Sequence, residues 1–287
     1  MPTEIHGKTI TTAMDNAVRH HLEVPIPDAV LNIETHLFHV TISANSCEYS
    51  LDLGREVWLN KSRWSRLIRE YINNTQLWRF IKQGMEIYHG KARKGATANM
   101  LFRDPERFAK KHRWGGCLMG VTFRGEHGNT PILTFFSRTT YMGYMGLLDA
   151  GIAHIMAQYI SGTPESAGEG VGDIGFRWHI SSQQLHCFKT IPHMFSKPDL
   201  MADLERYTRK PDAWCKEHLT PTWRYIVKWY RKILEAHKQY GVKMLDHEKY
   251  GPFRRIKRRW LEYKGYSKKN LPKSVMIRTL DFTKAVD

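Results

Sequence analysis

The chain has 287 residues, of which 41% are hydrophobic and 12% aromatic, so it can bury the core of one or two domains and is not a disordered chain. Its 44 Lys and Arg against 28 Asp and Glu give a formal charge of +16, which excludes an acidic solvating protein and favours a phosphorylated or polyanionic partner. Four widely spaced cysteines favour neither a zinc cage nor a disulfide framework, and no stretch is apolar enough for a secretory signal or a membrane span, so we expect a cytoplasmic protein without a metal and without a membrane partner.

The first half of the chain changes its pattern three times. Residues 1–34 mix scattered charge with Pro25 and Pro27, and we expect an irregular arm there. Residues 37–53 carry β-branched and aromatic residues in partial alternation, which indicates strands. Apolar residues at 3–4 spacing over 61–88 predict two amphipathic helices that meet near Asn73-Asn74. The Gly-rich and basic stretch 89–116 reads as a connection.

The second half predicts two more strands, an apolar helix, strand-like material and a long helical segment, at 117–123, 132–136, 147–160, 176–193 and 198–263. Together these elements predict an α+β fold with a large mixed sheet. We divide the chain into the arm 1–34, a core 35–195, and a basic helical segment 196–287 that packs on the core.

The residues with the most chemical content stand in a fixed order in the core. Cys117 opens a strand-like run, and Ser137-Arg138-Thr139 follows 21 residues later. After them come four further short motifs: Leu147-Leu148-Asp149, His154-Ile155-Met156-Ala157-Gln158, Gly172-Asp173 and His186-Cys187-Phe188. In this order the chain resembles the thymidylate synthase superfamily, which includes the deoxycytidylate hydroxymethylases. The resemblance covers roughly residues 37–195 and extends upstream to Leu59-Asn60-Lys61 and to the helix that carries Glu70.

The resemblance implies a catalytic role for Cys117, whose thiolate would add to C6 of a pyrimidine and make C5 nucleophilic. Arg138, with Thr139 beside it, would bind the 5′-phosphate and lower the pKa of the thiol. Glu70 would act as the general acid or base near the ring. The alternative for Glu70 is an ordinary glutamate on the surface of a helix.

The remaining residues of the implied site would contact the base and the sugar. Asp149 stands where the deoxycytidylate hydroxymethylases have Asp and thymidylate synthases have Asn, so it favours cytosine; the alternative is a helix N-cap. His186 would bind the 3′-hydroxyl, with Phe188 at the position of the family's tyrosine. The polar run 179–184 suggests that His179 and Gln183 or Gln184 line the pocket.

Two basic stretches remain outside this set. In the resembled family, arginines shortly before the nucleophile reach the partner's phosphate across a dimer, which suggests Arg103 or Arg107; a solvated basic helix is the alternative. Residues 249–269 hold nine Lys and Arg and one acid with interleaved aromatics, a composition compatible with nucleic-acid binding or with a solvated surface. The family's histidine after the nucleophile is Leu118 here, and its tryptophan-rich folate wall is not recognisable.

The resemblance therefore implies C5 one-carbon transfer to a pyrimidine nucleotide monophosphate by a homodimer paired through sheet faces. The resemblance implies methylenetetrahydrofolate as the donor, with hydroxymethylation of dCMP favoured over methylation of dUMP because of Asp149. Such an activity would suit a bacteriophage that modifies its DNA. Two alternatives stay open, namely a nucleic-acid-binding protein on the same scaffold and a base-modifying relative that uses no folate.

Overall fold

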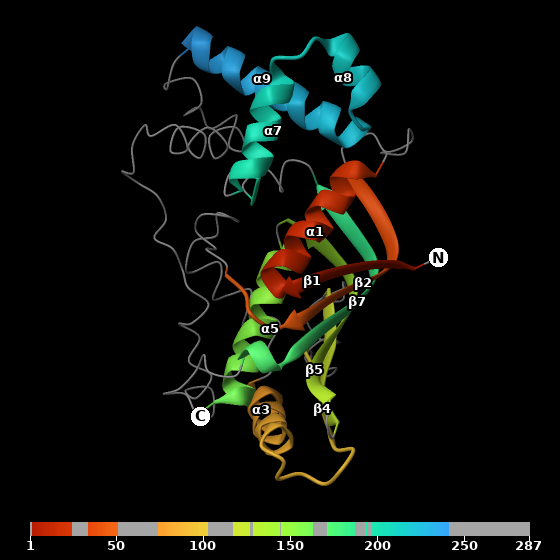
Figure 1. The fold of residues 1–287 in the computed structure, drawn as a ribbon, viewed down its shortest axis with the longest axis vertical. Helices are drawn as coiled ribbons and strands as arrows, with labels where there is room; N and C mark the ends of the chain where they lie inside the picture. Colours follow the sequence, from red (N-terminus) through yellow and green to blue (C-terminus); the bar gives the residue numbers. More distant parts are fainter. Residues whose placement is uncertain are drawn as a thin grey trace, which may run out of the picture.

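The computed structural model describes residues 2–24, 34–50, 74–102, 117–126, 129–143, 145–162, 171–186, 193–194 and 197–240. Six strands form one mixed sheet, with the order β1-β2-β7-β5-β4-β3 (Figure 1). The strands are β1 (Thr3–Thr9), β2 (Glu34–Ser46), β3 (Thr97–Leu101), β4 (Leu118–Glu126), β5 (Asn129–Met142) and β7 (Gly175–His186). The pairs β1·β2 and β5·β7 are parallel, and the other three pairs are antiparallel. The α+β class with a mixed sheet is thus confirmed.

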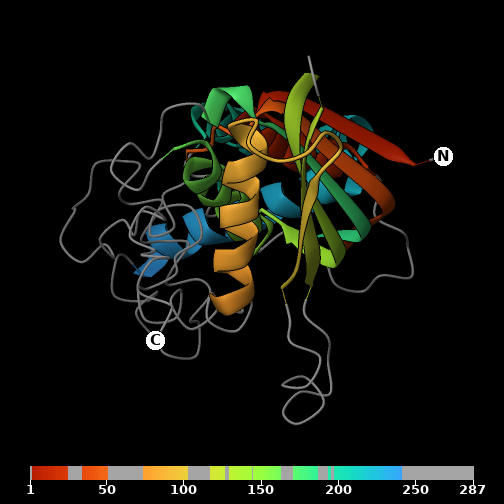
Figure 2. The same cartoon turned by 90° about the horizontal axis from the view of Figure 1, so that it is seen from below.

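The described helices form two groups, as Figures 1 and 2 show. Three of them cover one face of the sheet: α1 (Ile10–Glu23), α3 (Asn74–Tyr88) and α5 (Met145–Ser161). Three more gather at one end of the molecule: α7 (Pro198–Thr208), α8 (Asp212–His218) and α9 (Pro221–Tyr240). A short 3₁₀ turn, η3 (Val171–Asp173), precedes β7. No described helix combines the length with the apolar composition needed to cross a bilayer.

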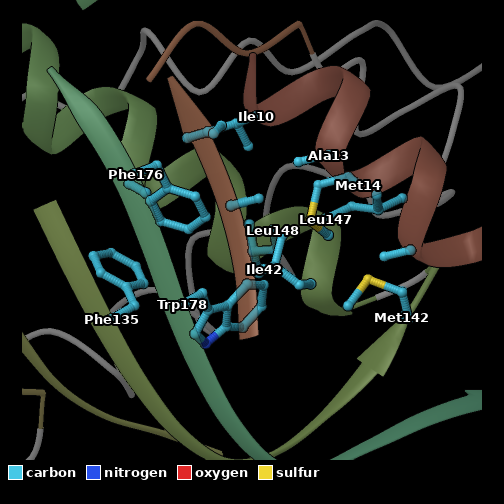
Figure 3. Close-up of a cluster of buried hydrophobic side chains, with 14 of the residues drawn as sticks. Ile10, Ala13, Met14, Ile42, Phe135, Met142, Leu147, Leu148, Phe176 and Trp178 are labelled. Atoms are coloured by element: carbon cyan, nitrogen blue, oxygen red, sulfur yellow. The ribbon is translucent and has the colours of Figure 1, made fainter. Parts of the chain in front are cut away.

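The core lies between the sheet and the covering helices (Figure 3). Phe135, Phe176 and Trp178 project from β5 and β7, and their rings meet at tilted or edge-on angles. Leu147 and Leu148 of α5 are fully or almost fully buried in the same layer. The Trp178 indole N–H donates to Ser137 Oγ at 2.8 Å, which satisfies the one polar atom that this ring carries into the core.

The N-terminal residues do not form the irregular arm that the composition suggests. β1 pairs in parallel with β2, and α1 begins with a capping box between Thr9 and Thr12. Ile10, Ala13 and Met14 are fully buried, so this segment is part of the core of the sheet layer. The expectation failed because β1 is an edge strand with few apolar residues, and because Pro25 and Pro27 follow the helix instead of interrupting it.

The C-terminal helices pack against α1. Thr220 Oγ1 donates to the Leu22 carbonyl at 2.6 Å, and the Asp15 carboxylate lies 3.1 Å from Lys197 Nζ.

The remaining predicted elements agree in kind and differ in extent. α5 spans two residues before and one after the predicted 147–160, and β3 was missed within the stretch that looked like a connection. The predicted helix near residues 61–72 lies outside the described residues.

The sheet changes which side chains face the core at one level of three neighbouring strands. On β5 the inward residues are 133, 135 and 137, and then 140 and 142; on β7 they are 176, 178 and 180, and then 183. The pairing register stays the same through this point, with Ser137 opposite Ile180 and Thr140 opposite Gln183. On β2, His39 has φ 52° at the same level. We call this level the sheet kink.

Candidate functional site

The hairpin of β4 and β5 brings the predicted nucleophile and the predicted phosphate ligand together. The Arg138 N–H donates to the Cys117 carbonyl at 2.9 Å, and the next pair along the hairpin is Leu118 with Ser137. Residues directly opposite in an antiparallel pair project from the same face, with Cβ atoms roughly 5 Å apart. Because Leu118 and Ser137 are buried, Cys117 and Arg138 point to the face that the described helices leave open. Cys117 is partly exposed and forms no disulfide.

A second polar group lies just beyond the sheet kink, on the side of the helices. Thr140 and Gln183 are opposite each other on β5 and β7 and are almost completely buried. Thr140 Oγ1 and both amide atoms of Gln183 have no hydrogen-bond partner. A Cβ placed on Gly146, in the first turn of α5, would lie 3.0 Å from Thr140 Oγ1, so this turn packs directly against the pair.

Asp149 belongs to the same buried region. It follows Gly146 by three residues, which places both on one side of α5. The carboxyl is 2% exposed, its Oδ1 has no hydrogen-bond partner, and burial raises its pKa to about 8. At neutral pH it is therefore mostly a neutral acid, able to donate as well as accept. Because α5 begins at Met145, Asp149 lies inside the helix, and the alternative of an N-cap is wrong.

Together, Thr140, Gln183 and Asp149 form what we call the buried polar cluster. Leaving a buried polar atom unpaired costs roughly 1–3 kcal/mol, so several such atoms side by side are unfavourable unless a polar molecule meets them. The cluster offers hydroxyl, amide and carboxyl groups, which is the mixture that recognises a heterocycle with adjacent donors and acceptors. Gln183, which the sequence analysis weighed together with Gln184, belongs to this cluster and is completely buried.

A cavity of about 410 Å³ lies beside the hairpin and receives residues from α3 and from strands β3, β4 and β5. Gln76 and Arg79 line it from α3, Asn99 and Thr122 from β3 and β4, and Phe136 from β5. Phe136 is two residues before Arg138 and therefore projects from the same face as the Cys117–Arg138 pair. The volume is that of a small-molecule site.

Several predicted site residues cannot be placed against this geometry. Glu70, Arg103, Arg107 and Phe188 lie outside the described residues. Gln184 and His186 belong to β7, where only their backbone is described. Thr139 follows Arg138 on β5, and its Oγ1 is buried without a hydrogen-bond partner. In the described part of the chain, no three His, Cys, Asp or Glu side chains are grouped as metal ligands.

His179 and His154, which the sequence analysis named, contact residues outside the Cys117–Arg138 pair and the buried polar cluster. His179 lies on the open face, where its ring stacks on Phe136 with centroids 5.5 Å apart and its Nδ1 lies 3.2 Å from Thr41 Oγ1. Burial, and secondarily Arg177, lower the pKa of His179 below its usual value, so the ring is neutral at pH 7. His154 donates through Nδ1 to the Cys47 carbonyl at 2.9 Å.

Comparison with known proteins adds no assignment. No protein-family model matches the chain, and no curated protein matches it.

Proposed function

We propose that the chain is a transferase that adds a one-carbon group to C5 of a pyrimidine deoxynucleotide monophosphate, with dCMP favoured over dUMP. The observation that carries the proposal is the direct opposition of Cys117 and Arg138 across the β4–β5 hairpin. The ordered motifs that resemble the thymidylate synthase superfamily led to the same two residues. The geometry supports the proposal because it gives a thiol a cationic neighbour on an accessible face.

Arg138 would serve two purposes at this position. Its guanidinium can hold two oxygens of the 5′-phosphate at once, which orients the nucleotide. Its charge also favours the thiolate over the thiol of Cys117, and the thiolate is the form that attacks carbon. Neither effect requires any residue outside the hairpin.

The chemistry of Cys117 follows from the weak reactivity of C5. When the thiolate bonds to C6, the C5–C6 double bond is lost and its electrons make C5 nucleophilic. After C5 has bonded to the incoming carbon, C5 gives up its proton. The electrons of that C–H bond restore the double bond, and the bond between Sγ and C6 breaks to return the thiolate.

The preference for cytosine comes from the resemblance at Asp149 and from the chemistry of the buried polar cluster, which lies on the side of the sheet opposite to Cys117. A neutral carboxylic acid at Asp149 can donate one hydrogen bond and accept another, so it can face a ring edge that carries both kinds of group. Gln183 offers a further donor and acceptor next to Thr140. The ring nitrogen N3 and the amino group N4 of cytosine are an adjacent acceptor and donor, which match this set.

Among the described residues that line the cavity, one side chain is aromatic, Phe136, and the cavity volume suits one nucleotide-sized ligand. Methylenetetrahydrofolate stays in the proposal as the donor that the resemblance implies, and we assign none of the described residues to it.

The proposal includes a homodimer that pairs through the open face of the sheet. Leu101, Gly120, Phe136, His179 and Thr41 stand opposite one another in succession across five strands. Phe136 is 39% exposed and Leu101 is 56% exposed, an apolar surface that no described helix covers. A second copy laid face to face would bury these side chains and place its own residues close to the Cys117–Arg138 pair. Sedimentation equilibrium of the purified chain measures the association.

The decisive test compares two cysteine variants. The wild-type chain is incubated with dCMP or dUMP, methylenetetrahydrofolate and labelled formaldehyde, and the labelled nucleotide is quantified. We expect Cys117→Ser to lose at least about 1000-fold in turnover, because a serine hydroxyl is a far weaker nucleophile. Cys47→Ser is the matched control: Cys47 is fully buried and donates to the Gly175 carbonyl, which a hydroxyl can also do.

Two readouts separate chemistry from binding. Exchange of the C5 hydrogen with solvent needs only the addition at C6, so it should disappear in Cys117→Ser even without a donor. Nucleotide affinity, measured by calorimetry, should stay within a few-fold of wild type, whereas Arg138→Gln should weaken it by at least about tenfold. Full turnover in Cys117→Ser would exclude the proposed mechanism.

A further inference from the structure

A basic groove lies between α8 and α9, at the end of the molecule remote from α3 (Figure 1). Its volume is about 420 Å³. Two of the nine residues that line it are carboxylates, and five are cations: Lys216, Arg224, Lys228, Arg231 and Lys232. The function proposed above does not use this groove.

Arg231 is the most firmly held cation of the groove, with a side chain that is 22% exposed. Arg231 is paired with the Asp212 carboxylate and donates to the Thr208 carbonyl at 3.1 Å, which ties α9 to the turn after α7. Arg224 donates to the Lys216 carbonyl at 3.3 Å and holds α8 against α9 from the other side. These contacts make the shape of the groove a property of the packed helices and not of mobile side chains.

The remaining cations are available to an anion. Lys216, Lys228 and Lys232 are exposed, and no salt bridge or cation–π contact joins them to another described residue. Arg224, Lys228 and Lys232 are spaced four residues apart along one side of α9. With a rise of about 1.5 Å per residue, they form a row of positive charge roughly 12 Å long.

We propose that this groove binds the phosphate backbone of a single-stranded nucleic acid. A row of separate lysines suits a linear polyanion better than a single phosphate, which a compact cluster of donors would hold. An acidic peptide would match the same charges. The chain favours nucleic acid because the sequence beyond α9 continues with nine Lys and Arg in 249–269, interleaved with Trp260, Tyr263 and Tyr266, and aromatic rings stack on bases.

The test measures salt-dependent binding of a labelled oligothymidylate of about 20 nucleotides by fluorescence anisotropy, between about 50 and 200 mM salt. The test variant is Lys228→Gln with Lys232→Gln, in the full chain. The control variant is Lys91→Gln with Lys94→Gln, which removes the same charge from exposed positions in the turn between α3 and β3. Circular dichroism verifies that both variants are folded.

We expect the slope of log affinity against log salt to become shallower by about 1.4 in the test variant, because each lost phosphate contact removes about 0.7. The control variant should keep the wild-type slope. An equal change in both variants would mean that net charge alone attracts the oligonucleotide, and no change in the test variant would mean that 249–269 binds without the groove; either result overturns the proposal. Equal affinity for an oligoglutamate of the same charge would also overturn it, in favour of an acidic protein partner.

Discussion

Replacing Asp149 with asparagine tests whether the buried polar cluster holds a neutral acid. Burial raises the pKa of this carboxyl from 3.8 to about 8, so the folded protein keeps a proton that the unfolded chain has already lost at neutral pH. The unfolded state then binds fewer protons than the folded state across this interval. Stability is therefore greatest below about pH 4, and it falls as the pH rises towards 8.

The size of the effect follows from one proton. Each pH unit between the two pKa values costs about 1.4 kcal/mol of stability, so wild type should lose about 2.5 kcal/mol between about pH 5 and pH 7 through this group alone. Asp149→Asn keeps the shape and has no proton to lose. Its free energy of unfolding, relative to wild type, should therefore rise by about 2.5 kcal/mol over the same interval.

The assay is urea denaturation followed by tryptophan fluorescence at a series of pH values. Asp199→Asn is the control for removal of a carboxylate, because Asp199 is exposed in the first turn of α7. Parallel pH profiles for wild type and Asp149→Asn would refute the argument that burial keeps this carboxyl protonated. The same variant should shift the base preference from cytosine towards uracil, since an amide can match either ring edge; an unchanged preference would remove Asp149 from the proposed base site.

Two further predictions concern a buried histidine and the open face. Burial lowers the pKa of His21 to about 3, and neither ring nitrogen has a hydrogen-bond partner, so the folded protein loses stability as the pH falls from about 6.5. His21→Leu should gain roughly 2 kcal/mol over wild type between about pH 6.5 and 4.5 in urea titrations, and equal pH slopes would contradict this. Phe136→Glu should convert the proposed dimer into a folded monomer in sedimentation equilibrium; an unaltered mass would place the dimer contact elsewhere.

Composition and spacing predicted the elements whose signal is local. The apolar run at 147–160 belongs to helix α5, on which almost every side chain is buried. The strand-like run at 176–186 is the central strand β7. The signal failed where packing decides the outcome. β1 and β3 are edge strands that bury few side chains, so their sequences resemble loops.

The sequence could indicate which residues carry chemistry more readily than which of them meet. Cys117 and Arg138 are 21 residues apart, and only the register of the β4–β5 hairpin sets them opposite each other. A hairpin shifted by one residue would send the two side chains to opposite faces. The sequence left two interpretations of Asp149 open, a base-binding residue and a helix N-cap. The N-cap interpretation required the helix to begin directly after Asp149, whereas α5 begins four residues before it.

The sheet kink sets which residues of the polar run in β7 face the core: Ser181 is exposed, Ser182 is partly exposed, and Gln183 is buried without a hydrogen-bond partner. A regular strand sends alternate residues to opposite faces, so a polar run would put a polar side chain into the core without a partner. At the kink, β5 and β7 change sides in step, and the residues just before it, including Arg138, face outward while Thr140 and Gln183 turn inward. Polar groups from a few consecutive residues thereby reach both faces at one level of the sheet. An unkinked strand would place Arg138 and Thr140 on one face. The kink instead puts Arg138, with Cys117 beside it, on the open face and leaves Thr140 and the rest of the buried polar cluster under the helices.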